Sequence, residues 1–472
     1  MGSFFSMANT KSDHSECNEV PSNETCKRQS TSSTSCEACP RLIPNLPDEL
    51  SLQIIARLPR SYYLNLRLVS RKWKATIMSS RLYKVRKGLE TTEEWLYLLI
   101  RVGENKVLWH ALDPHSKIWQ RLPIMPNVFD EEESQNGHSR FWMWNMVQGL
   151  FRQKDGSDEM PFCGCATGAV NGCLYVLGGF SKASSRCVLR YDPIQNAWKN
   201  LTCMSTGRAH CKTSMLNNKL YVVGGINQGQ GGLIPLTSAE VFDPLTDTWS
   251  TVPSMPFSSI GVLPTAFLAD TSKPIATGLI SYKGRLYVPQ SMHSWPFYAN
   301  TGGEIYDAET NSWMKMPIGM GEGWPAQHAG TKLSAVVDGE LYAFDPSGSK
   351  DNGRIKVYNE VEDAWKVVSG EVPVYELDDS ALVPPYLLAG FHGKLHFITK
   401  DVTCDVVVLQ VDLNNNLDSS PSTSSPPSQV SFNELFPGLC SESDAAVWKV
   451  VASRGFGQDE WDKLISCQVI DI

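Results

Sequence analysis

Histidine and cysteine are the side chains of this sequence that could do metal or redox chemistry. The chain has nine histidines and 13 cysteines. A copper oxidase would need histidine and tyrosine ligands that converge on one metal with an open position. Seven of the histidines are scattered along the chain, and no two of them have a convincing ligand spacing: His110, His115, His210, His293, His328, His392 and His396. We therefore expect no resident metal, no cofactor and no catalytic activity.

The cysteines do not predict a metal site either. Cys36-Glu-Ala-Cys39 has the spacing of half a zinc site, but no second pair lies at zinc-finger distance, which favours free thiols. Cys163-Gly-Cys165 is expected to pack in a strand. An odd number of cysteines without a secretory signal at the start is typical of reduced thiols inside the cell. The predicted location is the cytoplasm, the nucleus or both.

Charge and hydropathy argue against two further classes of protein. The net charge of −8 does not favour nucleic-acid binding, and the basic run between Arg71 and Lys87 is interpreted as a solvated helix face. No apolar run approaches the ~18 residues of a membrane span, so stable membrane insertion is not expected. Gly2 fits the myristoylation pattern, and a single acyl chain there would tether the protein only reversibly.

An internal repeat organises most of the chain. Five times an Asp or Asn is followed six residues later by Trp, and a sixth copy carries a long insert: Asp113/Trp119, Asp192/Trp198, Asp243/Trp249, Asp307/Trp313, Asn359/Trp365 and Asp412/Trp448. Asp suits a tight turn because it bonds its own backbone two residues on, and Trp supplies a large apolar surface. This regularity predicts one supersecondary unit used six times.

Each unit contains short strands. Leu174-Tyr-Val-Leu-Gly-Gly179 and Leu220-Tyr-Val-Val-Gly-Gly225 are aromatic and β-branched runs that stop at a glycine pair, where the backbone needs positive φ or close approach. The fourth and fifth copies lack the pair. About four antiparallel strands cannot bury both faces alone, and radial stacking solves this in a β-propeller. We predict a mainly β protein with a six-bladed propeller over residues 92–472 and insertions at 127–160 and 413–447.

The two ends of the chain differ in character. Residues 1–41 are rich in Ser, Thr, Asn and Glu, and we expect this N-terminal segment to be disordered. The first repeat, 92–126, lacks one strand of the propeller pattern. Residues 465–470 alternate as a half-buried strand does, so they are predicted to complete the first blade and remove an open edge.

Residues 42–88 have a helical rhythm instead. Leu46-Pro47-Asp48-Glu49-Leu50 begins a helix, because Pro suits the first helical position and acids favour the positive end of the dipole. Leu50, Ile54 and Leu58 continue an apolar stripe, and Pro59 ends the helix. A second helix is predicted from about Tyr63, with apolar residues at helical spacing: Leu66, Val69, Trp73 and Ile77. About 45 residues cannot build a self-sufficient core, so this segment is expected to dock on something else.

Both parts of the chain resemble known modules. Leu-Pro-Asp-Glu-Leu, Ile-Ile-Ala-Arg-Leu-Pro and Leu-Arg-Leu-Val-Ser-Arg-Lys-Trp between residues 46 and 73 resemble an F-box, and the repeats resemble kelch repeats. The combination is similar to plant F-box/kelch-repeat proteins, which are substrate receptors of SCF-type ubiquitin ligases. The resemblance implies that the F-box binds the SCF adaptor and, through it, a cullin, while the propeller binds an unknown protein client. The implied adaptor-binding residues are Leu46, Pro47, Leu50, Ile54, Leu58, Leu66, Val69 and Trp73, some of which must instead hold the helices together.

Loops at one end of the propeller are the predicted client site. By resemblance, Arg208 in Thr206-Gly-Arg-Ala-His210 falls in a blade-joining stretch that can present arginine to an acidic peptide; the alternative is an arginine that ties two blades together. Exposed aromatic residues near arginine are typical of binding hot spots. The further candidates are His210, Trp295, Trp324 and His328.

Two other functions stay open at this stage. One is a kelch scaffold without a ligase role, which would not co-purify with the adaptor and cullin. The other is a propeller enzyme, which would carry tightly bound metal after purification.

Overall fold

The structure is a computed structural model that describes most of the chain beyond residue 40. The described residues are 41–102, 106–126, 164–180, 184–229, 232–256, 274–294, 297–324, 332–345, 353–368, 372, 386–401, 403–411, 432–436, 448–456 and 463–472. Residues 1–40, including Gly2, Cys36 and Cys39, lie outside them, as does the predicted insertion 127–160. Of the second predicted insertion, 413–447, the described part is residues 432–436, which include helix α7 (Phe432–Leu435).

Residues 41–88 form a small bundle, here called the helical module. Its elements are α1 (Asp48–Ala56), the 3-10 turn η1 (Arg60–Tyr62), α2 (Tyr63–Leu66), α3 (Arg71–Ile77) and α4 (Ser80–Gly88). The predicted start of α1 is nearly correct: Pro47 is the N-cap, and Asp48 and Glu49 occupy the first turn. A small core holds the module together: Leu42, Leu52, Ile55, Ala56, Tyr63, Ile77 and Leu82.

The predicted second helix is wrong, because the chain breaks it into short pieces. The Ser70 hydroxyl accepts a hydrogen bond from the backbone N–H of Trp73, and Ser79 does the same for Leu82. Each serine caps a new helix, so α2 ends at Leu66 and α3 is a separate helix that begins at Arg71. None of the helices in the described part of the chain is long and apolar enough to cross a membrane.

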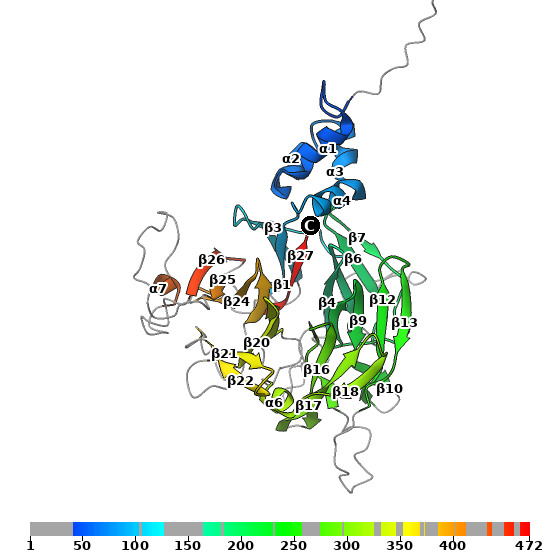
Figure 1. The fold of residues 1–472 in the computed structure, drawn as a ribbon, viewed down its shortest axis with the longest axis vertical. Helices are drawn as coiled ribbons and strands as arrows, with labels where there is room; N and C mark the ends of the chain where they lie inside the picture. Colours follow the sequence, from blue (N-terminus) through cyan, green and yellow to red (C-terminus); the bar gives the residue numbers. More distant parts are fainter. Residues whose placement is uncertain are drawn as a thin grey trace, which may run out of the picture.

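The rest of the described chain is a six-bladed β-propeller, and Figure 1 shows its blades arranged around a common centre. From the innermost strand outward, blades 1 to 3 are β27 (Lys463–Asp471), β1 (Glu94–Val102), β2 (Lys106–Leu112), β3 (Trp119–Arg121); β4 (Cys165–Val170), β5 (Cys173–Gly178), β6 (Val188–Asp192), β7 (Ala197–Asn200); and β8 (Lys212–Leu216), β9 (Lys219–Val223), β12 (Ala239–Asp243), β13 (Thr248–Val252). Blades 4 to 6 are β15 (Ile280–Tyr282), β16 (Arg285–Ser294), β17 (Phe297–Asp307), β18 (Ser312–Lys315); β19 (Ser334–Val337), β20 (Glu340–Asp345), β21 (Arg354–Asn359), β22 (Ala364–Val367); and β23 (Leu387–Phe391), β24 (Lys394–Lys400), β25 (Val406–Val411), β26 (Trp448–Arg454).

The innermost strands form a closed ring. Each contacts the next in the order β27, β4, β8, β15, β19, β23 and back to β27. Strand β27 pairs antiparallel with β1, from Glu94 opposite Asp471 to Arg101 opposite Lys463, so the C-terminal segment supplies the strand that the first repeat lacked. This is the pairing that the alternation over 465–470 predicted. It covers the β1 edge that would otherwise be open.

The repeated Asp and Trp residues work as a turn and an anchor. The Asp192 carboxylate accepts hydrogen bonds from the backbone N–H groups of Ile194 and Gln195, and Asn196 takes the positive φ that completes the turn. The indole N–H of Trp198 donates to the Pro123 carbonyl of blade 1, at 3.0 Å. Equivalent indole bonds join Trp249 to Thr202, Trp313 to Pro253 and Trp365 to Met320, so the marker of one blade ties it to the blade before.

The glycine pairs allow close approach between blades. Gly178 and Gly179 both have positive φ, and a Cβ on Gly178 would lie 2.0 Å from the Arg208 carbonyl oxygen. Blade 4 lacks the pair, and there β16 and β17 stay paired beyond the blade to Ser294 opposite Phe297, with an irregularity at Pro289. Strand β14 (Pro274–Ala276) adds to this extension, and β10 (Ile226–Gly229) with β11 (Gly232–Pro235) forms a separate hairpin on blade 3.

A matched pair of glycine substitutions separates backbone strain from close approach. Gly284 has a φ of +74° with open space around its Cβ position, whereas Gly178 has both positive φ and the Arg208 carbonyl in the way. We expect Gly284→Ala to cost about 1–2 kcal/mol. Gly178→Ala should cost at least about 2 kcal/mol more, because backbone must move. Thermal unfolding of both variants tests this, and equal losses would contradict the close-approach argument.

Candidate functional site

The eight residues predicted to bind an adaptor fall into two groups in the helical module. Pro47, Leu50, Ile54 and Val69 are exposed, and Leu46 is half-buried. Leu50 and Ile54 expose 48% and 46% of their surface although both are large and apolar. They lie four residues apart on α1, on the side away from the buried Leu52 and Ile55. These residues are free to contact a partner.

The other three predicted residues stabilise the module itself. Leu58, Leu66 and Trp73 are partly buried and pack against its core. The Trp73 indole N–H also donates to the Leu42 carbonyl at 2.7 Å, which closes the N-terminal turn over α3. Their place in the sequence pattern is therefore explained by folding, without a partner.

Three exposed apolar side chains escaped the sequence analysis. Tyr62, Leu64 and Leu68 lie on η1, α2 and the turn after it, and Leu68 is 84% exposed. The assumed continuous helix placed them between the apolar positions. The signal that could have found them is Ser70, because a cap there ends the earlier register and turns Leu68 and Val69 outward together.

The basic run contains one residue that is not on a solvated face. Arg86 is 2% exposed, and its guanidinium donates to the carbonyls of Ala56 and Leu58 and to the Glu93 carboxylate. Lys72 pairs with Asp48 at the surface of the module. The other members of the run are exposed or half-buried at the surface, as the sequence predicted.

Arg208 is buried, so it cannot present its charge to a client. It is 0% exposed, and its guanidinium lies 2.9 Å from the Glu240 carboxylate. It also donates to the carbonyls of Gly224 and Ser238, while its own carbonyl accepts from Gly179 in blade 2. Of the two alternatives left open by the sequence, the structure shows the arginine that ties two blades together.

Of the remaining client candidates, one is buried, one is half-buried and two lie outside the described residues. Trp324 was expected on an exposed loop, but it is 2% exposed and its ring packs edge-on against Trp365 at 5.3 Å, so that prediction is wrong. It follows helix α6 (Ile318–Gly323), which fills the space between two blades. His210 is half-buried with its ring 5.8 Å from Phe180, and burial lowers its pKa to about 4, so it is neutral at pH 7. Trp295 and His328 lie outside the described residues.

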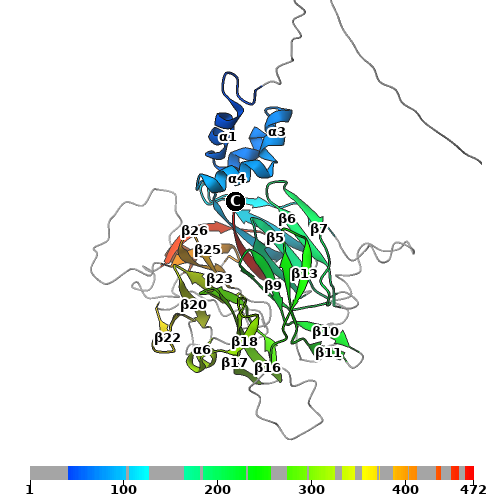
Figure 2. The ribbon, with the colours of Figure 1, turned by 45° about the vertical axis from the view of Figure 1, so that its right-hand side comes forward.

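The helical module sits on one face of the propeller. On that face it contacts two strand ends and one turn. The contacted residues are Asp471 at the end of β27, Glu93 just before β1, and Pro193 and Ile194 in the turn after β6. Because neighbouring strands in a blade are antiparallel, the connections from the second to the third strand lie on the opposite face. Those connections include the β10–β11 and β16–β17 hairpins, which Figure 2 shows far from the helices.

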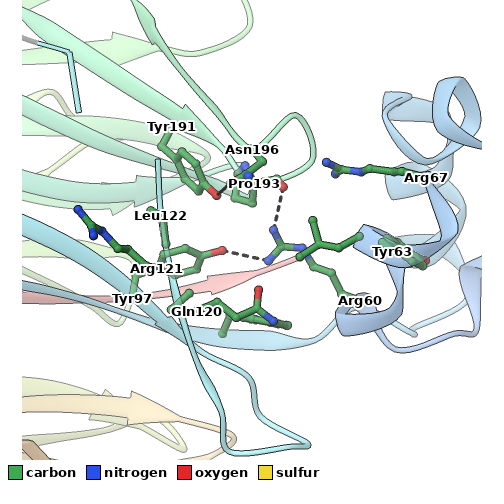
Figure 3. A pocket seen from close by; sticks show the side chains of 13 residues that line it. Arg60, Tyr63, Arg67, Tyr97, Gln120, Arg121, Leu122, Tyr191, Pro193 and Asn196 are labelled. Atoms are coloured by element: carbon green, nitrogen blue, oxygen red, sulfur yellow. Dashed lines mark hydrogen bonds between the residues drawn. The ribbon is translucent and has the colours of Figure 1, made fainter. Parts of the chain in front are cut away.

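A small pocket of about 130 Å³ lies where the module meets the propeller (Figure 3). Arg60 of the module reaches across it and donates to the Tyr97 hydroxyl at 3.1 Å and the Pro193 carbonyl at 2.8 Å. Burial raises the pKa of Tyr97, so its hydroxyl stays neutral. No periodic pattern in the sequence marks Arg60, so its role could not be predicted.

Metal ligands do not gather in the part of the chain that the structure describes. Among those residues, no group of three or more His, Cys, Asp or Glu side chains could hold a metal ion. His110 and His396 are both buried, and burial lowers the pKa of each to about 4.

Comparison with known proteins agrees with this arrangement. A profile of the F-box domain matches residues 43–85, and a profile of the kelch motif matches residues 161–205 and 207–256. The F-box/kelch-repeat protein At1g22040 of Arabidopsis thaliana is 56% identical over the full length of both chains. The chain belongs to the F-box/kelch-repeat proteins. Two more distant relatives are also from Arabidopsis thaliana. F-box protein AFR is 27% identical over 65% of this chain and 69% of that protein, and F-box/kelch-repeat protein At1g16250 is 31% identical over 46% of this chain and 51% of that protein.

The buried pair of this F-box/kelch protein predicts a large effect on stability. Arg208→Ala leaves the Glu240 carboxylate buried without its cation, which should cost about 3–5 kcal/mol. Lys283→Ala breaks an exposed ion pair with Glu360 and should cost less than about 1 kcal/mol. Thermal unfolding of the two variants measures the difference, and a small loss for Arg208→Ala would show that the pair is dispensable.

The same pair predicts a pH dependence. Burial alone would raise the pKa of Glu240, but hydrogen bonds from Ser205 and the charge of Arg208 hold it below its ordinary value. Its contribution to stability is therefore present above the unfolded glutamate pKa of ~4.3 and lost as the pH falls through the folded value. Arg208→Ala should reduce the loss of stability of the protein between neutral and acid pH, as followed by unfolding midpoints.

Proposed function

We propose that this protein is the substrate receptor of an SCF-type ubiquitin ligase. In this proposal the helical module binds the adaptor, the adaptor joins it to the cullin, and the propeller holds a protein client for ubiquitination. The chain itself performs no bond chemistry. The observation that carries the proposal is an F-box whose large apolar side chains are exposed while its own core is complete.

The exposed set is more than a small module needs for its own fold. Seven residues form the core of the module. Six other large apolar residues are exposed to solvent: Leu50, Ile54, Tyr62, Leu64, Leu68 and Val69. Exposed apolar surface of this kind marks a protein contact. Leu46 and Pro47, at the start of α1, extend the same end of the module.

The client is proposed to bind on the face opposite the helical module. The support is topological: the elongated connections of blades 3 and 4, β10–β11 and β16–β17, extend from that face. Trp295 stands between β16 and β17 in the sequence, and His328 lies in the stretch between α6 and β19. These two remain proposed client contacts, while Arg208 and Trp324 do not.

Adaptor binding is tested with purified adaptor and the intact chain. Leu50→Asp/Ile54→Asp should weaken binding at least about 100-fold, because each apolar side chain buried at an interface is worth about 1.5–3 kcal/mol. The thermal unfolding midpoint should stay unchanged, since both residues are exposed. Leu245→Asp is the matched control, because Leu245 is 87% exposed on a propeller turn.

Failure of the intact, folded chain to bind the adaptor would refute the ligase proposal. Equal weakening by Leu245→Asp would show that the effect of the double variant is not specific to the helical module. Cullin should co-purify with the intact chain from cells and be lost together with the adaptor.

The client face is tested with a receptor that cannot join the ligase. In the Leu50→Asp/Ile54→Asp background, clients should accumulate on the propeller and be counted by quantitative mass spectrometry. Adding Trp295→Ala/His328→Ala should reduce at least one enriched protein by about tenfold or more, since hot-spot residues each contribute about 2 kcal/mol. Leu245→Ala/Val361→Ala on the other face is the control, and no selective loss would overturn the assignment of the client face.

A further inference from the structure

The connection between the helical module and the propeller has no free length. Helix α4 ends at Gly88 and β1 begins at Glu94. Between them, Leu89 packs against the core of the module, and the backbone N–H of Thr91 donates to the Arg86 carbonyl. Glu93 exchanges two backbone hydrogen bonds of 2.9 Å with Ile472. The link is therefore an extra rung on the sheet of blade 1.

Two arginines of the module reach the propeller directly. The Arg60 guanidinium donates to the Tyr97 hydroxyl and the Pro193 carbonyl and lies 4.8 Å above the ring of Trp95 (Figure 3). Arg67 donates to the carbonyl of Ile194. A planar guanidinium suits this task because it stacks on an aromatic ring while its fork of donors meets several acceptors.

A third arginine joins the module to the link. The Arg86 guanidinium and the Glu93 carboxylate form an ion pair at 3.1 Å, with side chains only 3% and 10% exposed. Glu93 also accepts from the backbone N–H of Arg60 and from the indole of Trp95. One carboxylate of the link therefore binds groups from both the module and the propeller, and buried charge-assisted bonds of this kind tolerate little displacement.

The contact selects one turn among several equivalent ones. Ile194 of blade 2, Leu245 of blade 3 and Val361 of blade 5 all stand two residues after the repeated Asp or Asn. Val361 is 96% exposed, whereas the turn of blade 2 accepts bonds from both Arg60 and Arg67. The module is thus placed by specific partners in blades 1 and 2.

We propose that Arg60, Arg67 and Arg86 are positioning residues, which hold the helical module and the propeller at one fixed angle so that ubiquitin reaches a restricted set of lysines. This inference rests on the proposed ligase function. In the transfer, a lysine amine forms an isopeptide bond with the ubiquitin carboxyl terminus as the thioester to the conjugating enzyme breaks and its thiol leaves. With a flexible link, many lysines at different positions each have some effective concentration at the site of transfer. With a rigid link, only the few lysines that are held near that site have a high one.

The fixed angle is tested first without the ligase, by amide hydrogen exchange of the full chain. Arg60→Ala/Arg67→Ala removes the three hydrogen bonds to the propeller, and the amides of Thr91 and Glu93 should exchange about tenfold faster or more, because the link opens locally. Amides of β9 should not change. Arg57→Ala/Arg71→Ala is the charge-matched control, because both arginines are exposed on the module. Tyr97→Phe, a milder change, should give a smaller effect in the same amides.

Equal exchange in the double variant and the control would overturn the proposal that these arginines hold the angle. Adaptor binding is measured on the same proteins and should be equal in both, which separates loss of position from loss of the proposed function. If the intact chain binds no adaptor, the ligase proposal fails while the exchange result still stands.

The consequence for transfer is measured on lysines of the receptor itself, which makes a client unnecessary. In a reconstituted ligase, mass spectrometry should find a restricted set of modified receptor lysines for the intact chain and for the Arg57→Ala/Arg71→Ala control. Arg60→Ala/Arg67→Ala should spread the modification over at least twice as many lysines. An unchanged pattern, in a variant whose link exchanges faster, would show that transfer does not depend on the angle.

Discussion

The pairing of β27 with β1 is the interaction on which the rest of the structure depends. It completes blade 1 and closes the ring of innermost strands, because β27 also contacts β23 on one side and β4 on the other. Cys467 and Leu464 of this strand are buried in the core between blades 6 and 1. The same pairing continues one rung further, where Ile472 bonds Glu93, so ring closure and the mounting of the helical module share one ladder. A break in this ladder would affect both at once.

Much of the fold could be predicted because its signals are local. The turn needs Asp or Asn at one position and a residue tolerant of positive φ four places later, and in blades 2 to 5 the Trp that follows pairs with Tyr or Phe. The glycine pairs mark positions where a Cβ atom would collide with nearby backbone, so another residue would not fit there. The alternation at the C-terminal end indicates a half-buried strand, and the first repeat lacked the strand that pairs with the inner edge of β1.

The failures of prediction come from interactions between distant parts of the chain. Nothing near Arg208 marks Glu240 as its partner, since the two lie on different blade elements, and an isolated Thr-Gly-Arg-Ala-His stretch looks like an exposed loop. Trp324 is buried because the preceding helix α6 packs closely against β17 and β22 through its glycines. The spacing of residues in the sequence does not reveal this packing. In the helical module, an apolar stripe predicted which residues matter but not which side of the module each one faces. Ser70 decides that by ending one helical register and starting another.

The C-terminal origin of the innermost strand of blade 1 sets an order of events during synthesis. The helical module emerges from the ribosome first, whereas its seat on blade 1 is complete only after every other blade has been made. Until then Glu93 has no rung to pair with, and the pairing of β1 is among the longest-range contacts that the chain contains. In an unfinished chain the helical module therefore lacks its contact with blade 1, and shortened translation products would lack a defined angle between the module and the propeller.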